Sequence, residues 1–176
     1  IEQSGVTIGG GVDLGQQSEA DLRRRGVPEA LIEKVRPFLG LKREAADRFV
    51  RDNPLILTED QARLLTDRVR GGIALEVARN FNRDSNLRFE DLPPEAQTVI
   101  VSVATQFGPN LFLPAEQGGT PRFWRFVTAG DWQSALEELR DFGDAFQPRR
   151  DEEAKKLLEA FPDLEDPGRI SDDERP

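Results

Sequence analysis

Thr7 and Asp13 are the residues of this chain best suited to acid–base chemistry, and they stand six positions apart in a glycine-rich segment. The chain contains no histidine and no cysteine, so it offers neither an imidazole base nor a thiolate nucleophile. Any acid or base step near neutral pH must therefore use carboxylates. A hydroxyl beside a carboxylate can hold a nucleophilic water, as an inverting glycosidase requires. The alternative interpretation of Asp13 is a turn residue that hydrogen-bonds its own backbone.

The composition limits the classes of partner that the chain can have. It has 176 residues with a net charge of -9, of which 37% are hydrophobic and 32% are charged. The negative charge argues against nucleic acid or an anionic membrane as the main partner, and no apolar run approaches the roughly 18 residues of a membrane span. The lack of cysteine excludes a disulfide framework and a sulfur-ligated zinc site. We expect a monomer with no metal and no cofactor.

The glycine-rich segment at residues 4–15 predicts a small β-hairpin, because its glycines are interleaved with β-branched residues. Ser18 predicts a helix N-cap, and Gly26 predicts the end of that helix. Pro28 then suits the first position of the next helix. Strand content should be low and confined to the start of the chain.

A long helix is predicted to begin at Thr58. Thr58 and Gln61 have the spacing of a capping box, in which each side chain bonds the backbone N–H of the other residue. Apolar residues then recur every four positions, at Leu65, Val69, Ile73, Val77 and Phe81. Gly71 and Gly72 weaken the middle of this helix by about 1 kcal/mol each relative to alanine, which permits bending or close packing there.

Helices also dominate the second half of the chain. The apolar run from Val99 to Val103 predicts a helix that is buried on most sides, and the amphipathic positions of Trp124 and Trp132 favour core packing over contact with sugars. Further helices are predicted at residues 42–51, 123–128, 132–142 and 149–160. We therefore expect a mainly α (α+β) chain with an N-terminal lobe at 1–57, a connecting helix at 58–82, a helical lobe at 83–162 and an acidic tail at 163–176.

Two weaker motifs have simpler explanations. Gly9-Gly10-Gly11 lacks the spacing of a phosphate-binding loop, so nucleotide binding is not expected. The segment from Asp163 to Glu174 has an acidic first position, Gly168 at the sixth and a glutamate at the twelfth, as a calcium loop does. Pro167 occupies a ligand position there, so we interpret the segment as a solvated acidic tail.

The segment Gly5-Val-Thr7-Ile-Gly-Gly-Gly-Val-Asp13-Leu-Gly-Gln-Gln17 resembles the active-site hairpin of pesticin-like lysozymes, which are bacterial toxin relatives of the phage T4 lysozyme family. Four later segments resemble that family in order: Leu57 to Ala62, Gln106-Phe107-Gly108, Gly130-Asp131-Trp132 and Gln147-Pro148-Arg149-Arg150. The resemblance covers residues 4–161. It implies a two-lobed T4-lysozyme-like fold in which a long helix joins the hairpin lobe to an all-helical lobe and the N-terminal helix of the family is missing.

The resemblance implies that Thr7 and Asp13 position and activate water. The phage branch has its aspartate six residues before the threonine, where this chain has Ile1. The general acid of the family is a glutamate on a helix before the hairpin, and Glu2 is too close to Thr7 to occupy that helix. Because the chain begins at Ile1 and contains no methionine, we expect a fragment or a processed form whose general acid lies upstream, and little activity from residues 1–176 alone.

Three residues are expected to bind substrate. By resemblance, Gln106 lines the cleft and hydrogen-bonds an N-acetyl group or a sugar hydroxyl, with a polar helix end as the alternative. Arg149 and Arg150 are expected to meet peptide or carboxylate groups of the glycan strand, with ordinary ion pairing to Asp151 and Glu152 as the alternative.

The function that the resemblance implies is that of a lysozyme, or muramidase. It would cleave the β-1,4 bond between N-acetylmuramic acid and N-acetylglucosamine in peptidoglycan by a single displacement. We expect an antibacterial toxin or effector that is secreted or delivered to the periplasm of a target bacterium, with the glycan strand and an immunity protein as partners. Two alternatives stay open: a non-catalytic peptidoglycan-binding or structural module with a lysozyme fold, and a lytic transglycosylase, which leaves an anhydro sugar.

Overall fold

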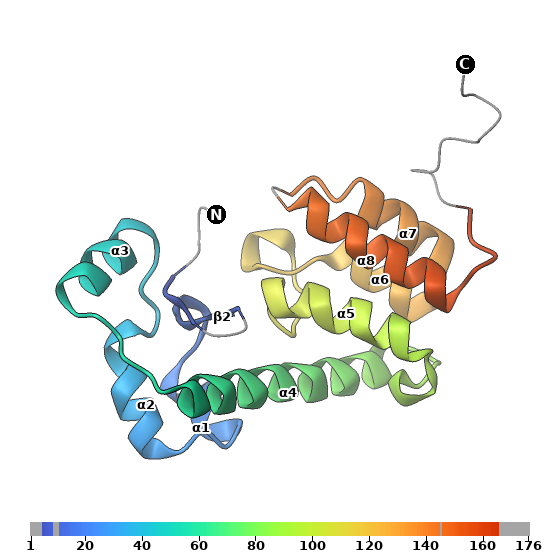
Figure 1. Ribbon diagram of the computed structural model, residues 1–176. Helices are drawn as coiled ribbons and strands as arrows, with labels where there is room; N and C mark the ends of the chain where they lie inside the picture. The colour runs from blue at the N-terminus through green and yellow to red at the C-terminus, as the bar shows by residue number, and fades with distance from the viewer. Residues whose placement is uncertain (1–4, 9–10, 145, 166–176) are drawn as a thin grey trace. The chain divides into compact units, whose positions relative to one another are not determined.

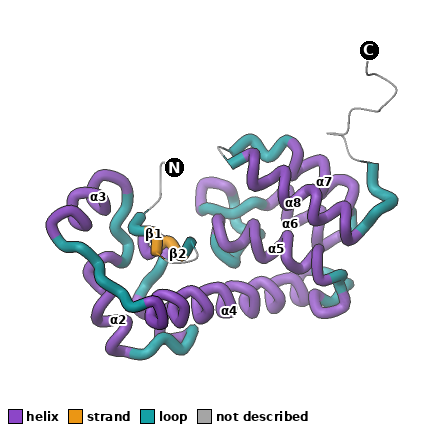
Figure 2. Tube along the Cα trace, in the orientation of Figure 1, coloured by secondary structure: helices purple, strands orange, loops and turns teal. Residues whose placement is uncertain are grey.

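Helices form most of the chain in this computed structural model, which describes residues 5–8, 11–144 and 146–165 (Figure 1). Figure 2 shows that the strands in the described part of the chain are confined to one short hairpin. The chain divides into two units, residues 1–72 and 73–176. The boundary falls within the long helix α4 (Glu59–Asp84), so each unit contains part of this helix. The expected mainly α class with a small hairpin is confirmed.

The first unit contains the predicted hairpin and three short helices before α4. Its elements are β1 (Thr7–Ile8), β2 (Val12–Asp13), η1 (Leu14–Gln16), α1 (Glu19–Arg24), α2 (Glu29–Val35), η2 (Arg36–Phe38) and α3 (Arg43–Asp52). The predicted cap at Ser18 is confirmed, since its Oγ accepts a hydrogen bond of 3.1 Å from Asp21 N. Pro28 is the N-cap of α2 instead of its first residue, because its ψ of 140° is extended.

The core of the first unit ties the hairpin to the helices. Buried apolar side chains come from the end of the hairpin and from α1, α2 and α4: Leu14, Leu22, Ile32, Val35 and Leu65. Phe38 of η2 meets Phe49 of α3 edge to face, with ring centroids 5.3 Å apart. Because Leu14 directly follows β2, burial of this side chain fixes the end of the hairpin on the helices.

The predicted capping box at the start of α4 is confirmed. Thr58 Oγ1 accepts a hydrogen bond of 3.2 Å from Gln61 N, and Gln61 Oε1 accepts one of 3.1 Å from Thr58 N. The apolar stripe of this helix is buried as expected, at Leu65, Val69, Ile73, Val77 and Phe81.

The two central glycines of α4 have different surroundings. A Cβ on Gly72 would lie 2.4 Å from Cγ and 2.6 Å from Cδ of Arg25, whereas a Cβ on Gly71 would have no neighbouring heavy atom within 4 Å. The stem of Arg25 therefore crosses α4 at Gly72. This is the close packing that a glycine pair permits.

The second unit is built on helices that follow α4. Its further elements are η3 (Phe89–Asp91), α5 (Pro94–Phe107), η4 (Ala115–Gln117), α6 (Pro121–Ala129), α7 (Trp132–Arg140) and α8 (Gln147–Ala160). α8 packs against both α5 and α7, and α6 packs against α7. Val99, Ile100 and Val103 of α5 are buried, as the apolar run predicts.

Both tryptophans contact aromatic rings of the second unit, and Trp124 lies in the core as expected, whereas Trp132 is half-buried. Trp124 is buried, lies edge-on to Phe81 with ring centroids 6.1 Å apart, and donates a hydrogen bond of 3.0 Å from Nε1 to Asp84 Oδ2. Trp132 stacks on Phe161 with centroids 4.6 Å apart.

Several helix ends differ from their predicted positions by two residues. α6 begins at Pro121 because proline needs no hydrogen bond in the first turn. α7 already ends at Arg140, and α8 already begins at Gln147. None of the helices among the described residues has the length and apolar character needed to span a membrane.

Gly71→Ala should stabilise the protein by about 0.5–1 kcal/mol, because alanine removes the entropic penalty of a helical glycine and meets no neighbour. Gly72→Ala should be neutral or destabilising, because its methyl group must displace Arg25. Urea unfolding followed by circular dichroism measures the free energy of unfolding of each variant. Equal stabilisation by both substitutions would contradict the packing of Arg25 on α4.

Asp84 should make the stability of the second unit depend on pH. Its hydrogen bonds from Arg83 lower the pKa of this carboxyl, partial desolvation opposes the shift, and Trp124 adds to the lowering. A carboxyl with a lowered folded pKa contributes stability above its unfolded pKa of about 3.9, and the contribution is lost as pH falls through the folded value. The wild type should therefore be more stable than Asp84→Asn near neutral pH, with a difference that shrinks below about pH 4. Unfolding curves that show the same difference at neutral and strongly acidic pH would contradict this.

Candidate active site

The hairpin places Thr7 directly opposite Asp13. The adjacent pair carries a ladder hydrogen bond, because Leu14 N donates to Val6 O at 2.8 Å. Thr7 and Asp13 therefore form a non-hydrogen-bonded antiparallel pair, whose side chains share one face with Cβ atoms about 4.5–5.5 Å apart. Thr7 is exposed and Asp13 is half-buried. The structure thus brings together Thr7 and Asp13, the two residues that we expect from the sequence to activate water.

One carboxylate oxygen of Asp13 is fixed by the backbone. Oδ1 accepts hydrogen bonds from Gly5 N at 3.0 Å and from Gly15 N at 2.8 Å. The second of these caps η1, in the way that the turn interpretation of Asp13 predicts. Among the described residues, Oδ2 accepts no hydrogen bond and no direct hydrogen bond joins Asp13 to Thr7. Oδ2 and the Thr7 hydroxyl can therefore share a bound water.

Gly5 and Gly15 approach the carboxylate too closely for any side chain to fit. A Cβ on Gly5 would lie 2.3 Å from Leu41 O and 2.8 Å from Asp13 Oδ1. One on Gly15 would lie 2.5 Å and 3.0 Å from the same two atoms. Because Leu41 O belongs to the backbone, it cannot move aside as the end of a long side chain can. Asp13 can therefore keep this position only if residues 5 and 15 are both glycine.

Three further hydrogen bonds hold the hairpin from outside. Gly40 N donates to Leu14 O at 3.2 Å. Gln17 Nε2 donates to the carbonyl oxygen of Asp13 at 3.3 Å, and Arg25 Nη1 donates to Gln17 Oε1 at 2.6 Å. Arg25 is the side chain that crosses α4, so these contacts connect the backbone of the candidate catalytic residue to the long helix.

Some predicted features lie outside the described residues. They are Ile1, Glu2, Gly9, Gly10, Gly168 and Glu174. In the part of the chain that the structure describes, no three acidic side chains come together in a way that could hold a metal ion.

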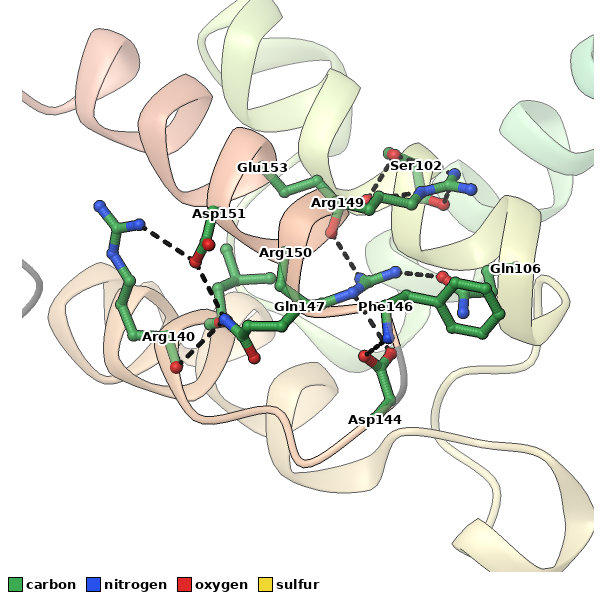
Figure 3. Close-up of polar contacts among 11 residues, drawn as sticks. Ser102, Gln106, Arg140, Asp144, Phe146, Gln147, Arg149, Arg150, Asp151 and Glu153 are labelled. Atoms are coloured by element: carbon green, nitrogen blue, oxygen red, sulfur yellow. Dashed lines mark hydrogen bonds and ion pairs between the residues drawn. The ribbon is translucent and has the colours of Figure 1, made fainter. Parts of the chain in front are cut away.

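The other three candidate residues lie in the second unit, at the end of α5 and the start of α8 (Figure 3). Arg150 is 0% exposed. Its guanidinium contacts Glu153 Oε2 at 2.5 Å and Asp144 Oδ2 at 3.4 Å. It also donates a hydrogen bond to Gln106 Oε1 and lies over the ring of Phe142, 4.8 Å from the centroid. Burial lowers the pKa of Arg150, and the charges of Glu153 and Asp144 oppose this shift.

Arg149 lies at the edge of the same cluster, with a side chain that is 42% exposed. Its Nε donates to Glu153 Oε1 at 3.2 Å, and its Nη2 donates to the carbonyl oxygen and the hydroxyl of Ser102 at 2.9 and 3.1 Å. The hydroxyl of Ser102 in turn donates to Glu153 Oε1 at 2.5 Å. The positive charges of Arg149 and Arg150 are thus balanced by the negative charges of Glu153 and Asp144.

Arg150 does not fit the expected contact with a glycan strand, because a fully buried guanidinium cannot reach a ligand on the surface. Its expected alternative partners, Asp151 and Glu152, are not its partners either. The structure pairs it with Glu153 and Asp144 instead. Arg150 is therefore a structural side chain in this arrangement.

Gln106 and Arg149 keep surface that a ligand can reach. Gln106 is half-buried, with its oxygen turned to Arg150. Sequence reasoning missed Glu153, although it stands three residues after Arg150 and so on the same helical face. Asp144 gave no such signal, because it lies in the loop before α8, where no helical spacing applies.

A sequence model of the pesticin family, described as a bacterial toxin homologue of phage lysozyme, C-term, matches residues 1–133. The chain belongs to this family. The match includes Thr7, Asp13 and Gln106, whereas Arg149 and Arg150 lie beyond it. No curated protein matches the chain. Membership in the pesticin family gives a mainly α, T4-lysozyme-like fold and indicates an enzyme of the glycoside hydrolase kind, with peptidoglycan as its substrate.

Gly15→Ala should destabilise the pesticin-family hairpin by about 1–3 kcal/mol, the usual range for overpacking, because its methyl group would collide with Leu41 O and Asp13 Oδ1. Urea unfolding measures the loss, and the NMR shift of the Gly5 amide reports whether Asp13 still accepts its hydrogen bond. Gly71→Ala is the control, since it adds the same methyl group in open space. A Gly15→Ala protein with wild-type stability and an unchanged Gly5 shift would show that a side chain is tolerated there.

Proposed function

We propose that this chain is a peptidoglycan hydrolase that cleaves the β-1,4 bond between N-acetylmuramic acid and N-acetylglucosamine. The observation that carries the proposal is the Thr7–Asp13 pair in a hairpin of a lysozyme homologue. One oxygen of Asp13 is bound by two backbone amides, and the other accepts no hydrogen bond from a described residue. This arrangement suits a water held between a proton acceptor and a hydroxyl.

In the proposed reaction, water attacks the anomeric carbon and the glycosidic oxygen leaves from the opposite side. Asp13 takes the proton from the attacking water, and Thr7 orients the water through its hydroxyl. The leaving oxygen takes a proton from a second carboxylic acid, which we expect, by resemblance to the family, on a helix before the hairpin. General acid catalysis of this kind contributes about a hundredfold to ten-thousandfold in rate.

A non-catalytic module that binds peptidoglycan is the second candidate function. It is favoured by one observation: Asp13 Oδ1 caps η1 and also binds Gly5 N, so this carboxylate already has a structural role in the hairpin. The module would retain the lysozyme fold and bind glycan strands without releasing products. Release of soluble fragments from purified peptidoglycan distinguishes the two functions.

Delivery and partners follow from the proposed substrate. Peptidoglycan lies in the periplasm of a target bacterium, so we place the action of the protein there as an antibacterial toxin or effector. A producer of such a toxin needs protection of its own wall. An immunity protein that binds the toxin is the partner that this requirement predicts.

In protein extended upstream to include the expected general acid, Asp13→Asn should lower the rate of fragment release from purified peptidoglycan by at least about a hundredfold, because an amide cannot accept the proton of the attacking water. The asparagine oxygen can still accept the hydrogen bonds from Gly5 and Gly15, so stability should change little. Thr7→Val should lower the rate about tenfold, as expected for loss of one hydrogen bond to the reacting water.

Mass spectrometry of the released fragments identifies the reaction. A reducing-end N-acetylmuramic acid indicates hydrolysis, and an anhydro sugar indicates a transglycosylase. Melting temperatures of both variants serve as the folding control. Fragment release by Asp13→Asn at the wild-type rate would rule out the proposed role of this carboxylate.

A further inference from the structure

The negative charge of this chain is confined to its second unit. Residues 1–72 contain twelve basic and twelve acidic side chains, so the whole net charge of -9 comes from residues 73–176. Because the hairpin with Asp13 belongs to the first unit, the charge of the whole chain does not describe the surroundings of this carboxylate. The individual cations near the hairpin decide which charges a bound glycan strand meets there.

One cation lies at the turn of the hairpin. A Cβ added to Gly11 would have one heavy atom of the described residues within 4 Å, and this atom is Nη2 of Arg70, at 3.9 Å. Arg70 is exposed and belongs to α4, so the long helix places its guanidinium at the hairpin. Gly11 stands two residues before Asp13, which corresponds to about 7 Å along an extended strand. A guanidinium has five N–H donors, so it can keep its contacts within the protein and still bind a carboxylate.

A second cation lies at the open end of the hairpin. The Cβ positions of Gly5 and Gly15 are each within 3.0 Å of both Leu41 O and Asp13 Oδ1, so these two oxygens are close neighbours. Lys42 follows Leu41 directly, which puts its Cα within about 8 Å of Asp13 Oδ1. Its side chain is exposed and makes no ion pair with any residue that the structure describes. The long stem of this lysine lets its ammonium reach a ligand held at Asp13.

Arg43 adds a third cation beside Lys42, in a conformation that costs free energy. Its φ of 54° is left-handed, where Cβ comes too close to the backbone, whereas glycine takes the same conformation without strain. The side chain of Arg43 is exposed, and the negative charge of the next residue, Glu44, is paired with Arg48 at 3.2 Å. A strained, charged and exposed residue near a candidate catalytic carboxylate indicates that its side chain has a role in binding.

We infer that Lys42, Arg43 and Arg70 form a cationic rim around Asp13, and that this rim binds the carboxylates of the stem peptides of peptidoglycan. The inference rests on the proposed function, because it names the groups that this hydrolase recognises beside the glycan. A carboxylate that approaches Asp13 is repelled by its negative charge, and cations at both ends of the hairpin offset this repulsion. Arginine can bind a carboxylate through two parallel hydrogen bonds, and lysine adds a charge on a flexible stem.

NMR titration of the whole chain with two forms of one glycan fragment tests the inference. The fragment is the disaccharide N-acetylglucosaminyl-N-acetylmuramic acid with its stem peptide, which lacks the bond that the proposed hydrolase cleaves. One form keeps its carboxylates, the other has them converted to neutral methylamides, and amines are acetylated in both. The wild type should bind the carboxylate form about tenfold more tightly, with shifts at the amides of Gly5, Gly11 and Gly15. Added salt should lower this affinity ratio toward one, because exposed charges are screened.

A double variant with a matched control separates the rim from the general charge of the protein. Arg70→Gln combined with Lys42→Gln should bring the affinity ratio close to one. The control combines Arg68→Gln with Lys34→Gln and has the same total charge. In the control, Arg68 lies against Gly26 and Lys34 stands on α2, so neither cation is at the hairpin. The control should keep most of the wild-type ratio.

Arg43→Gly separates binding from a structural role of this side chain. Glycine removes the left-handed strain, so the melting temperature should rise. Loss of one cation should at the same time lower the affinity ratio about twofold. A lower melting temperature with an unchanged ratio would overturn the place of Arg43 in the rim.

Equal affinity of the wild type for the two forms, no binding of either form, a wild-type ratio in the double variant, or an equal loss in its control would overturn the inference. Fragment release from peptidoglycan by protein extended upstream, together with any of these results, would leave the hydrolase assignment intact. A preference for the carboxylate form without fragment release would reject the hydrolase and keep the rim as a binding site for anionic stem peptides.

Discussion

The carboxylate of Asp13 keeps its place because two glycines bring their backbone amides against one of its oxygens. Gly5 and Gly15 donate to the same Oδ1, and each lies so close to Leu41 O that a Cβ would overlap it. A side chain at either position would separate the strands from the loop after η2 and release the carboxylate. The glycine-rich composition of the hairpin is thus a consequence of where the carboxylate must sit. The usual association of glycine runs with phosphate binding does not apply to these two positions.

The register of that hairpin is held by the rest of the first unit. A shift by one residue would turn Asp13 to the opposite face and expose Val12, since side chains alternate along a strand. Burial of Val12 and Leu14 opposes such a shift from the core side. The chain of hydrogen bonds from Arg25 through Gln17 to the carbonyl oxygen of Asp13 opposes it from α4. Gly72 of α4 is part of this constraint, because only there can the stem of Arg25 cross the helix.

Local chemistry explains which parts of the structure could be predicted from sequence. The capping box of Thr58 and Gln61, the N-cap at Ser18 and the facing of Thr7 and Asp13 each depend on residues within a few positions of one another. The burial of Arg150 could not be predicted in this way. It depends on Gln106, which stands 44 residues before Arg150 and contacts it only because α5 packs against α8. From sequence, an arginine next to acidic residues is typical of an exposed helix start.

Each unit contains a polar side chain that is oriented by an internal hydrogen bond to one of its two polar atoms. Asp13 keeps a free acceptor, whereas Gln106 keeps a free donor. A carboxylate and a carboxamide each carry two polar atoms, and binding one of them internally fixes the direction of the other. Asp13 gives Oδ1 to backbone amides and keeps an acceptor, and Gln106 gives Oε1 to a buried guanidinium and keeps a donor. Because neither side chain has to be ordered when a ligand arrives, less rotamer entropy is lost on binding. Burial of Arg150 without an opposite charge nearby would destabilise the fold. The hydrogen bond from Arg150 to Gln106 is therefore possible only because Glu153 and Asp144 pair with the guanidinium.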